Sequence, residues 1–228
     1  GRIVMRALAA LFALSAAGIG APPTPADGGD ATLALTGATI YASPGDAPIA
    51  RGVVLVRDGR IVAVGPATTH PVPADATRVD FEGLFVVAGF QNSHVHFTEA
   101  KWEDAAKAPA AQLSAQLEDM LLRWGVTTAV DTGSLLSNTL ALRARIESGE
   151  VRGPRVYTVG TPTYPHNGVP YYLRESLPPE VLPLLNTPQT GAEAAAITAR
   201  QIEAGADALK LFTGSWVERG KVLPMDAA

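Results

Sequence analysis

The first third of the chain contains short runs in which apolar and polar residues alternate, separated by clusters of Pro, Gly and Asp. This period of two is typical of β-strands with one buried face. Asp58-Gly59 lies between two such runs, which predicts a two-residue hairpin turn with positive φ angles. The strands form too small a sheet to make a closed core unaided, so we expect residues 27–83 to pack on another part of the protein. The predicted strands are residues 33–41, 52–57, 60–64 and 77–81.

From residue 84 onward, apolar runs alternate with segments of helical periodicity. One apolar stripe at helical spacing predicts a core-facing helix that Gly125 ends, and it consists of Leu113, Leu117, Met120, Leu121 and Trp124. Thr190 and Glu193 match a capping box, the signature of a helix start. Strands that are separated by helices imply parallel β/α units, and about four units can be counted. The fold class is therefore α/β.

The boundaries of these later elements follow from the same patterns. Gly149 and Gly205 follow two of the predicted helices. In the region of alternating strands and helices, the later strands are expected at residues 126–131, 155–160 and 206–212, and helices at 138–148 and 190–204. A loop with the first turn of another helix is expected at 214–228.

The N-terminus differs from the rest of the chain. Met5 and Arg6 precede an unbroken run of small and apolar residues from Ala7 to Ala21, and a Pro-rich junction follows. This order is typical of a secretory signal peptide, so we assign residues 1–26 to a signal peptide and junction. The expected location is periplasmic or extracellular, without a permanent membrane span; a tether that is never cleaved is the alternative.

Composition narrows the function. The net charge is −4 and there is no Lys/Arg run, so the sequence does not predict nucleic acid as a partner. Cysteine is absent, which excludes disulfides, thiolate ligands and a Cys nucleophile. Histidine and carboxylate side chains remain as candidate metal ligands.

Two of the four histidines, His94 and His96, follow a buried apolar run at a spacing of two residues. In an extended chain these side chains point the same way, so two imidazoles can converge on one cation. Parallel β/α folds carry their active sites at the carboxyl ends of strands. Lys210 lies in the apolar segment Ala208-Leu-Lys-Leu-Phe212, where a lone cation requires neutralisation or an ion pair, for example with Asp131.

The run from Val87 to His96 resembles the first-strand motif of the amidohydrolase superfamily, in which a Gly is followed by His-X-His. Gly205-Ala-Asp-Ala-Leu-Lys210 resembles the fourth-strand segment of that superfamily. The early strands are similar to the small β-sandwich that flanks the barrel in many members. The resemblance covers residues 33–228 and is closest to the imidazolonepropionase-like and prolidase-like branch.

The resemblance implies that residues 84–228 form the first half of a (β/α)8 TIM barrel and residues 27–83 part of a β-sandwich. It also implies one or two divalent metal ions, zinc being the first choice, held by His94, His96 and a carboxylated Lys210. The ions would activate water for hydrolysis of a C–N amide bond in a dipeptide or cyclic amide. The loop after the third strand, with Tyr164 and His166, is expected to contact this small-molecule substrate. His166 as a solvated loop residue is the alternative reading.

The sequence also departs from the superfamily pattern. Ala88 stands where Pro is common, and Asn92 stands where Asp is usual. The later histidines and the general acid/base Asp of the superfamily have no counterpart in these 228 residues, so we expect the chain to be inactive alone. Separately, we expect a homo-oligomer when the protein is full length. The alternatives are a non-catalytic exported half-barrel that binds a ligand or partner, and a deaminase or cyclic-ureide hydrolase of the same superfamily.

Overall fold

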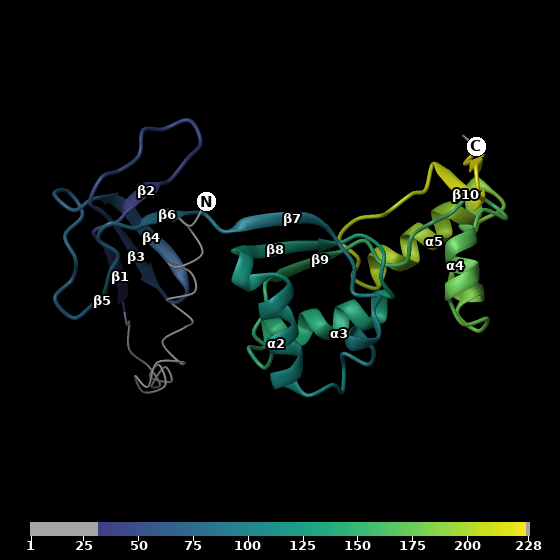
Figure 1. The fold of residues 1–228 in the computed structure, drawn as a ribbon, viewed down its shortest axis with the longest axis horizontal. Coiled ribbons are helices and arrows are strands. Elements are labelled where there is room, and N and C mark those ends of the chain that lie inside the picture. Colours follow the sequence, from purple (N-terminus) through teal and green to yellow (C-terminus); the bar gives the residue numbers. More distant parts are fainter. Residues whose placement is uncertain (1–31, 227–228) are drawn as a thin grey trace. The chain divides into compact units, whose positions relative to one another are not determined.

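The computed structural model describes residues 32–226, and these residues form two units that are described separately. The first unit comprises residues 32–90 together with Arg123–Gly125. It contains a four-stranded sheet in the order β4-β3-β1-β5 and a two-stranded sheet of β2 and β6 (Figure 1). Its strands are β1 (Thr32–Thr36), β2 (Thr39–Tyr41), β3 (Gly52–Arg57), β4 (Arg60–Pro66), β5 (Thr77–Asp80) and β6 (Phe85–Val87).

The hairpin predicted at Asp58-Gly59 is confirmed. Strands β3 and β4 pair antiparallel, with Arg57 opposite Arg60 across the turn. Asp58 and Gly59 have φ angles of 50° and 70°, and positive φ at both central positions is the geometry that matches the twist of the flanking strands.

One hydrophobic core serves both sheets of the first unit. Phe81, Ile40 and Val54 are its large buried side chains, and they come from β2, β3 and the residue after β5. Full burial of each of these side chains stabilises the fold by roughly 1.5–3 kcal/mol. The two sheets are therefore held by a shared core.

The second unit comprises Gln91–Leu122 and residues 126–226. It contains a three-stranded sheet in the order β7-β8-β9, in which β8 and β9 are parallel. Helices α2 and α3 lie on the same side of this sheet (Figure 1). The elements are β7 (Phe90–Val95), η1 (Ala100–Trp102), α2 (Ala110–Met120), η2 (Leu122–Trp124), β8 (Val126–Asp131), α3 (Leu136–Glu147), β9 (Arg155–Thr158), α4 (Tyr171–Ser176), η3 (Leu182–Leu184), α5 (Gly191–Glu203), β10 (Gly214–Glu218) and β11 (Lys221–Pro224).

The apolar stripe predicted for α2 forms the centre of the second core. Leu113, Leu117 and Leu121 are buried there against side chains of β8, β9 and α3. Trp124 was expected on the same stripe, but its side chain is 53% exposed. The α-helix ends at Met120, and the following 3-10 turn has a different rotation per residue, so the helical phase does not extend to Trp124.

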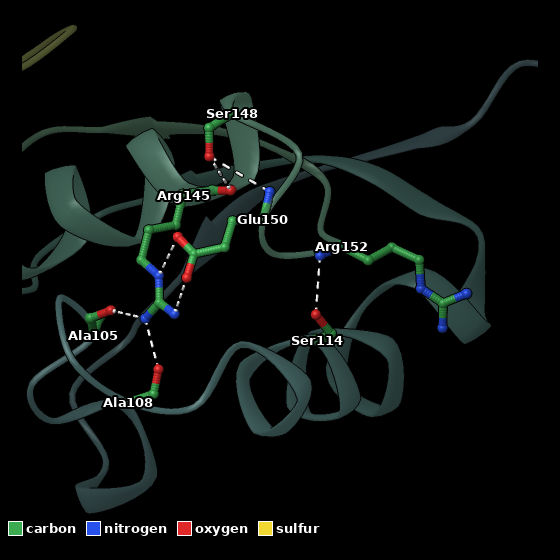
Figure 2. Close-up of polar contacts among 7 residues, drawn as sticks. All are labelled: Ala105, Ala108, Ser114, Arg145, Ser148, Glu150 and Arg152. Carbon is green, nitrogen blue, oxygen red and sulfur yellow. Dashed lines mark hydrogen bonds and ion pairs between the residues drawn. The ribbon is translucent and has the colours of Figure 1, made fainter. Parts of the chain in front are cut away.

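Arg145 on α3 joins three segments of the second unit (Figure 2). Its Nη1 donates to the carbonyl oxygens of Ala105 and Ala108, both at 2.7 Å. Its Nε and Nη2 donate to the two carboxylate oxygens of Glu150, at 3.0 and 2.6 Å. A planar guanidinium can serve a carboxylate and two carbonyls at once because its donors point in fixed directions.

The start of α5 is confirmed. Thr190 Oγ1 accepts from the backbone N of Glu193 at 3.2 Å, as an N-cap residue does. The Glu193 carboxylate accepts from the backbone N of Gln189 at 2.7 Å, one residue before the position of an ideal capping box.

The two predictions for the C-terminal part are wrong. Residues 206–212 were expected as a strand, but they form only an isolated bridge between Leu211 and Thr163. Residues 214–228 were expected to begin a helix, but β10 and β11 form an antiparallel hairpin. Trp216 and Val222 lie opposite each other in this hairpin, and such β-branched and aromatic cross-strand pairs favour strands over a helix.

The described part of the chain is thus a mixed α/β structure. Within residues 32–226 the parallel sheet has three strands and does not close into a barrel, so the half-barrel assignment stays a prediction. No helix in this range combines the length and the apolar character that a bilayer crossing requires. The signal peptide predicted at residues 1–26 lies outside the described range.

Candidate metal centre

His94 and His96 lie at the carboxyl end of β7. His94 is the penultimate residue of the strand, and His96 follows its last residue, Val95. The chain is still extended there, so the two side chains share one face and Val95 points into the core between them. The ring centroids are 5.2 Å apart, with an interplanar angle of 74°. The juxtaposition predicted from the spacing is therefore present.

The surroundings of His96 favour the neutral form of its ring. Partial burial lowers the pKa of His96, Asp131 opposes that effect, and His94 and Lys210 add to the lowering. The combined effect is a lowered pKa, in which burial is the largest cause. A neutral imidazole is the form that binds a metal ion.

Asp131 ends β8 and is completely buried. Its Oδ1 accepts from Ser134 Oγ at 2.7 Å and from the backbone N of Gly133 at 3.2 Å. Its Oδ2 accepts from Thr139 Oγ1 at 2.7 Å and from Thr158 Oγ1 at 3.2 Å. Both oxygens are thus used by hydroxyl and amide donors, which satisfies the buried carboxylate.

Lys210 lies in the irregular segment after α5. Its carbonyl oxygen accepts from the backbone N of Thr163 at 2.9 Å. Its side chain is half-buried, and Nζ lies 5.3 Å from the centroid of the Phe212 ring. Among the described residues the alternative ion pair with Asp131 is not formed, because that carboxylate is occupied by hydroxyl donors.

The predicted substrate residues lie in the loop after β9. Tyr164 is only 3% exposed, and its ring centroid lies 4.6 Å from that of Phe212. Burial, with a smaller contribution from Tyr172, raises the pKa of Tyr164 to about 12, so its hydroxyl is neutral at physiological pH. His166 is exposed in a turn closed by a 2.7 Å hydrogen bond from Gly168 N to Pro165 O. Their contact with a substrate stays a prediction.

The fourth histidine belongs to the first unit. His70 lies over Gly65, where an added Cβ would come within 2.0 Å of its Cε1 atom. Its ring therefore packs on the backbone of β4.

The donor set fits part of a metal site. Two neutral imidazoles suit zinc and the other divalent transition metals. Among residues 32–226, no group of three or more His, Asp or Glu side chains is arranged to hold a metal ion. A lysine is not a ligand as an ammonium, so Lys210 would add an oxygen donor only after carboxylation.

One neighbour of this pair was missed by sequence reasoning. Ser134 Oγ accepts from the backbone N of Phe97 at 2.7 Å, directly after His96. Asp131-Thr-Gly-Ser134 reads as a turn that ends a strand, and a hydroxyl three residues after an acidic strand end was the available signal.

Comparison with known proteins adds independent information. No protein-family model matches the chain. An imidazolonepropionase of a Methylobacterium species is 30% identical over 109 residues, which are 48% of this chain and 25% of that enzyme. A 5-methylthioadenosine/S-adenosylhomocysteine deaminase of Symbiobacterium thermophilum is 42% identical over 65 residues, 28% of this chain and 15% of the deaminase.

A solved structure from Bifidobacterium longum, described as a candidate prolidase, superimposes with a TM-score of 0.59 at 28% identity. The match covers 80% of this chain and 41% of that one. The chain therefore spans less than half the length of each of these three relatives. The sequence matches and the shared fold agree: over the part that they cover, this chain is similar to members of the amidohydrolase superfamily.

Proposed function

We propose that this chain contributes the first metal ligands of an enzyme that hydrolyses a C–N bond of a small molecule, such as a dipeptide or a cyclic amide. The observation that carries the proposal is the pair His94 and His96, with ring centroids 5.2 Å apart at the carboxyl end of β7. Similarity to a superfamily whose named relatives include an imidazolonepropionase and a prolidase-type structure supports the same reaction class.

The side chains divide the work between binding and support. His94 and His96 would donate ring nitrogens to one divalent ion, with zinc as the ion that best suits imidazole and carboxylate oxygen ligands. When bound, the ion would polarise the scissile carbonyl and acidify a water molecule. Asp131 is engaged by four donors, so its part is structural.

Lys210 would join the site as a carbamate. The Lys210 ammonium first releases one proton, and the neutral amine then forms an N–C bond with CO2 and releases a second proton, so a cation is replaced by an anionic oxygen donor. Its half-buried position supports this role. A second ion would then be held between this carbamate and further ligands.

Two loop residues and the cellular setting complete the proposal. Tyr164, with a neutral hydroxyl, and His166, exposed on the loop after β9, would lie on the substrate side. Export to the periplasm or the outside rests on the pattern in residues 1–26. Homo-oligomer formation is proposed for the longer protein.

A deaminase is the second candidate, and one observation favours it. The 42% identity over 65 residues is to a deaminase, and the same metal chemistry serves deamination and amide hydrolysis. Release of ammonia from a substrate panel would favour the deaminase, whereas release of a carboxylate and an amine without ammonia would favour the amidohydrolase. A ligand-binding half-barrel without catalysis would show neither product.

Elemental analysis of the longer protein that contains this chain, and of its double variant H94A/H96A, tests the site. We expect one or two divalent ions per chain in the wild type and none in the double variant. The double variant H70A/H166A is the matched control, because it removes the same number of imidazoles elsewhere, and it should keep its metal. Equal metal content in H94A/H96A and the wild type would overturn the assignment.

A further inference from the structure

The segment Thr132–Ser134 runs alongside residues 95–97, with Thr132 beside Val95 and Ser134 beside Phe97. Thr132 N donates to the carbonyl oxygen of Val95 at 3.0 Å, and Ser134 Oγ accepts from the backbone N of Phe97 at 2.7 Å. These two hydrogen bonds hold the peptide groups on both sides of His96. Because β7 ends at Val95, the regular sheet ladder does not reach His96, and these contacts take its place.

Gly133, between the two contacts, faces the imidazole itself. A Cβ added at Gly133 would lie 3.4 Å from Cε1 of His96 and 2.8 Å from Cγ of Pro162. The loop backbone therefore lies close to the ring: an added Cβ would be in ordinary van der Waals contact with His96 and would clash with Pro162. Packing on a backbone restricts the rotation of a side chain, as rotamer sterics require.

Asp131 anchors this arrangement in the core. Ser134 Oγ donates to Asp131 Oδ1 at 2.7 Å while it accepts from Phe97 N, so one hydroxyl links a buried charge to the backbone beside His96. Thr139 on α3 and Thr158 on β9 fix the other carboxylate oxygen. Hydrogen bonds to an ionised acceptor are shorter and stronger than neutral ones. The loop is thus tied to β7, β9 and α3.

We propose that Asp131, Thr132, Gly133 and Ser134 form a cradle that orients the His96 ring for metal binding, with Ser134 as its key positioning residue. This assigns the Asp131-Thr-Gly turn to support of a ligand. The inference rests on the proposed metal site. In other proteins, removal of a hydrogen bond that orients a metal ligand typically lowers metal affinity or activity 10–100-fold.

The test compares S134A, S134T and the control S148A in cobalt(II) titrations of the full chain. S134A should weaken cobalt binding about 10-fold or more and speed amide hydrogen exchange at Phe97. S134T keeps the hydroxyl and should restore both properties. Ser148 is a matched control, because its exposed hydroxyl also bonds to backbone, donating to Arg145 O at 3.0 Å, but it belongs to no part of the cradle; S148A should match the wild type.

Each other outcome decides the question. Cobalt affinity of S134A within twofold of wild type, together with faster exchange at Phe97, would overturn the positioning role. If S134A does not fold, S134C replaces it, since a thiol of similar size is only a weak hydrogen-bond acceptor; unchanged cobalt affinity in S134C would likewise refute the cradle.

A wild-type chain that binds no cobalt would instead overturn the proposed function. In that case NMR relaxation of the His96 ring in the metal-free chain judges the cradle by itself. A ring that is ordered in the wild type and S134T but mobile in S134A supports the cradle. Equal order in wild type and S134A contradicts it.

Discussion

The backbone N–H of Thr158 donates a 2.8 Å hydrogen bond to the Asp207 carboxylate, at the point where β9 would pair with a fourth parallel strand. Asp207 N donates to Thr158 O at 2.8 Å, which is one bond of such a ladder. The parallel pattern would direct Thr158 N to the carbonyl of Gly205, but Arg143 Nη2 donates to that oxygen at 3.0 Å. Side-chain groups thus replace the ladder, and residues 206–212 stay irregular.

The variant D207A should lower the free energy of unfolding by about 1–2 kcal/mol, because it removes charge-assisted bonds from Arg143 Nη1 and Thr158 N. D207N keeps an acceptor oxygen for Thr158 and should lose less. Urea unfolding measures both. Glu218, which forms an exposed 3.0 Å ion pair with Lys221, gives the control E218A, with an expected loss below about 0.5 kcal/mol. An equal loss in D207A and E218A would show that Asp207 holds nothing in place.

The elements that sequence reasoning located correctly are those with a strong local signal. The Asp58-Gly59 turn requires positive φ at two positions, and the Leu113/Leu117/Leu121 stripe has helical spacing. Both signals lie within a few residues. The irregular segment 206–212 depends on Arg143 and Thr158, which are distant in sequence, so no local pattern could reveal it. The β10–β11 hairpin was missed because Trp216 and Val222 pair only after the turn forms.

The same division holds at the candidate site. The period-two spacing of His94 and His96 was enough to predict that the two rings meet. The partner of the following peptide, Ser134, comes from another strand end, and it is recognised only when β7 and β8 lie side by side. Lys210 was expected to be buried in a strand, but it is half-buried over Phe212 because that strand does not form.

Asp131 should be more important to stability than any exposed aspartate. D131N replaces two acceptor oxygens by one and places an NH2 group against hydroxyl donors, so we expect a loss of about 2–3 kcal/mol in the free energy of unfolding. The exposed Asp75 supplies the control D75N, with a change within about 0.5 kcal/mol. Urea denaturation at pH 7 compares the two. A loss in D131N no larger than in D75N would contradict the buried network.

Arg145 and Glu150 predict an acid-sensitive clamp (Figure 2). The hydrogen bonds that the Glu150 carboxylate accepts from Arg145 lower the pKa of Glu150 below its ordinary value of 4.5. A lowered carboxylate pKa gives stability that is present above the unfolded-state pKa and is lost as the pH falls through the folded-state value. Wild type should therefore lose part of its advantage over E150Q as the pH decreases below about 4.5.

A second comparison separates the hydrogen bonds of Arg145 to the two carbonyl oxygens from its ion pair with Glu150. R145K cannot bond Ala105 O, Ala108 O and the Glu150 carboxylate together. It should therefore be less stable than E150Q at pH 7 and should show faster amide exchange in residues 105–109. If R145K is as stable as E150Q, the two carbonyl contacts contribute nothing.

Tyr164 predicts a loss of stability at alkaline pH. Its folded-state pKa is about 12, raised by burial from 10.0, so the folded state keeps a proton that the unfolded state releases between these values. Stability is then complete below pH 10 and decreases as the pH rises towards 12, by on the order of 1–3 kcal/mol.

The variant Y164F lacks the titrating group. The difference in urea midpoint between wild type and Y164F should therefore shift against the wild type from pH 8 to pH 11. Absorbance at 295 nm, which follows tyrosinate formation, should show one more late-titrating group in wild type than in Y164F. A pH-independent difference, or the loss of an early-titrating group, would contradict the burial of the Tyr164 hydroxyl.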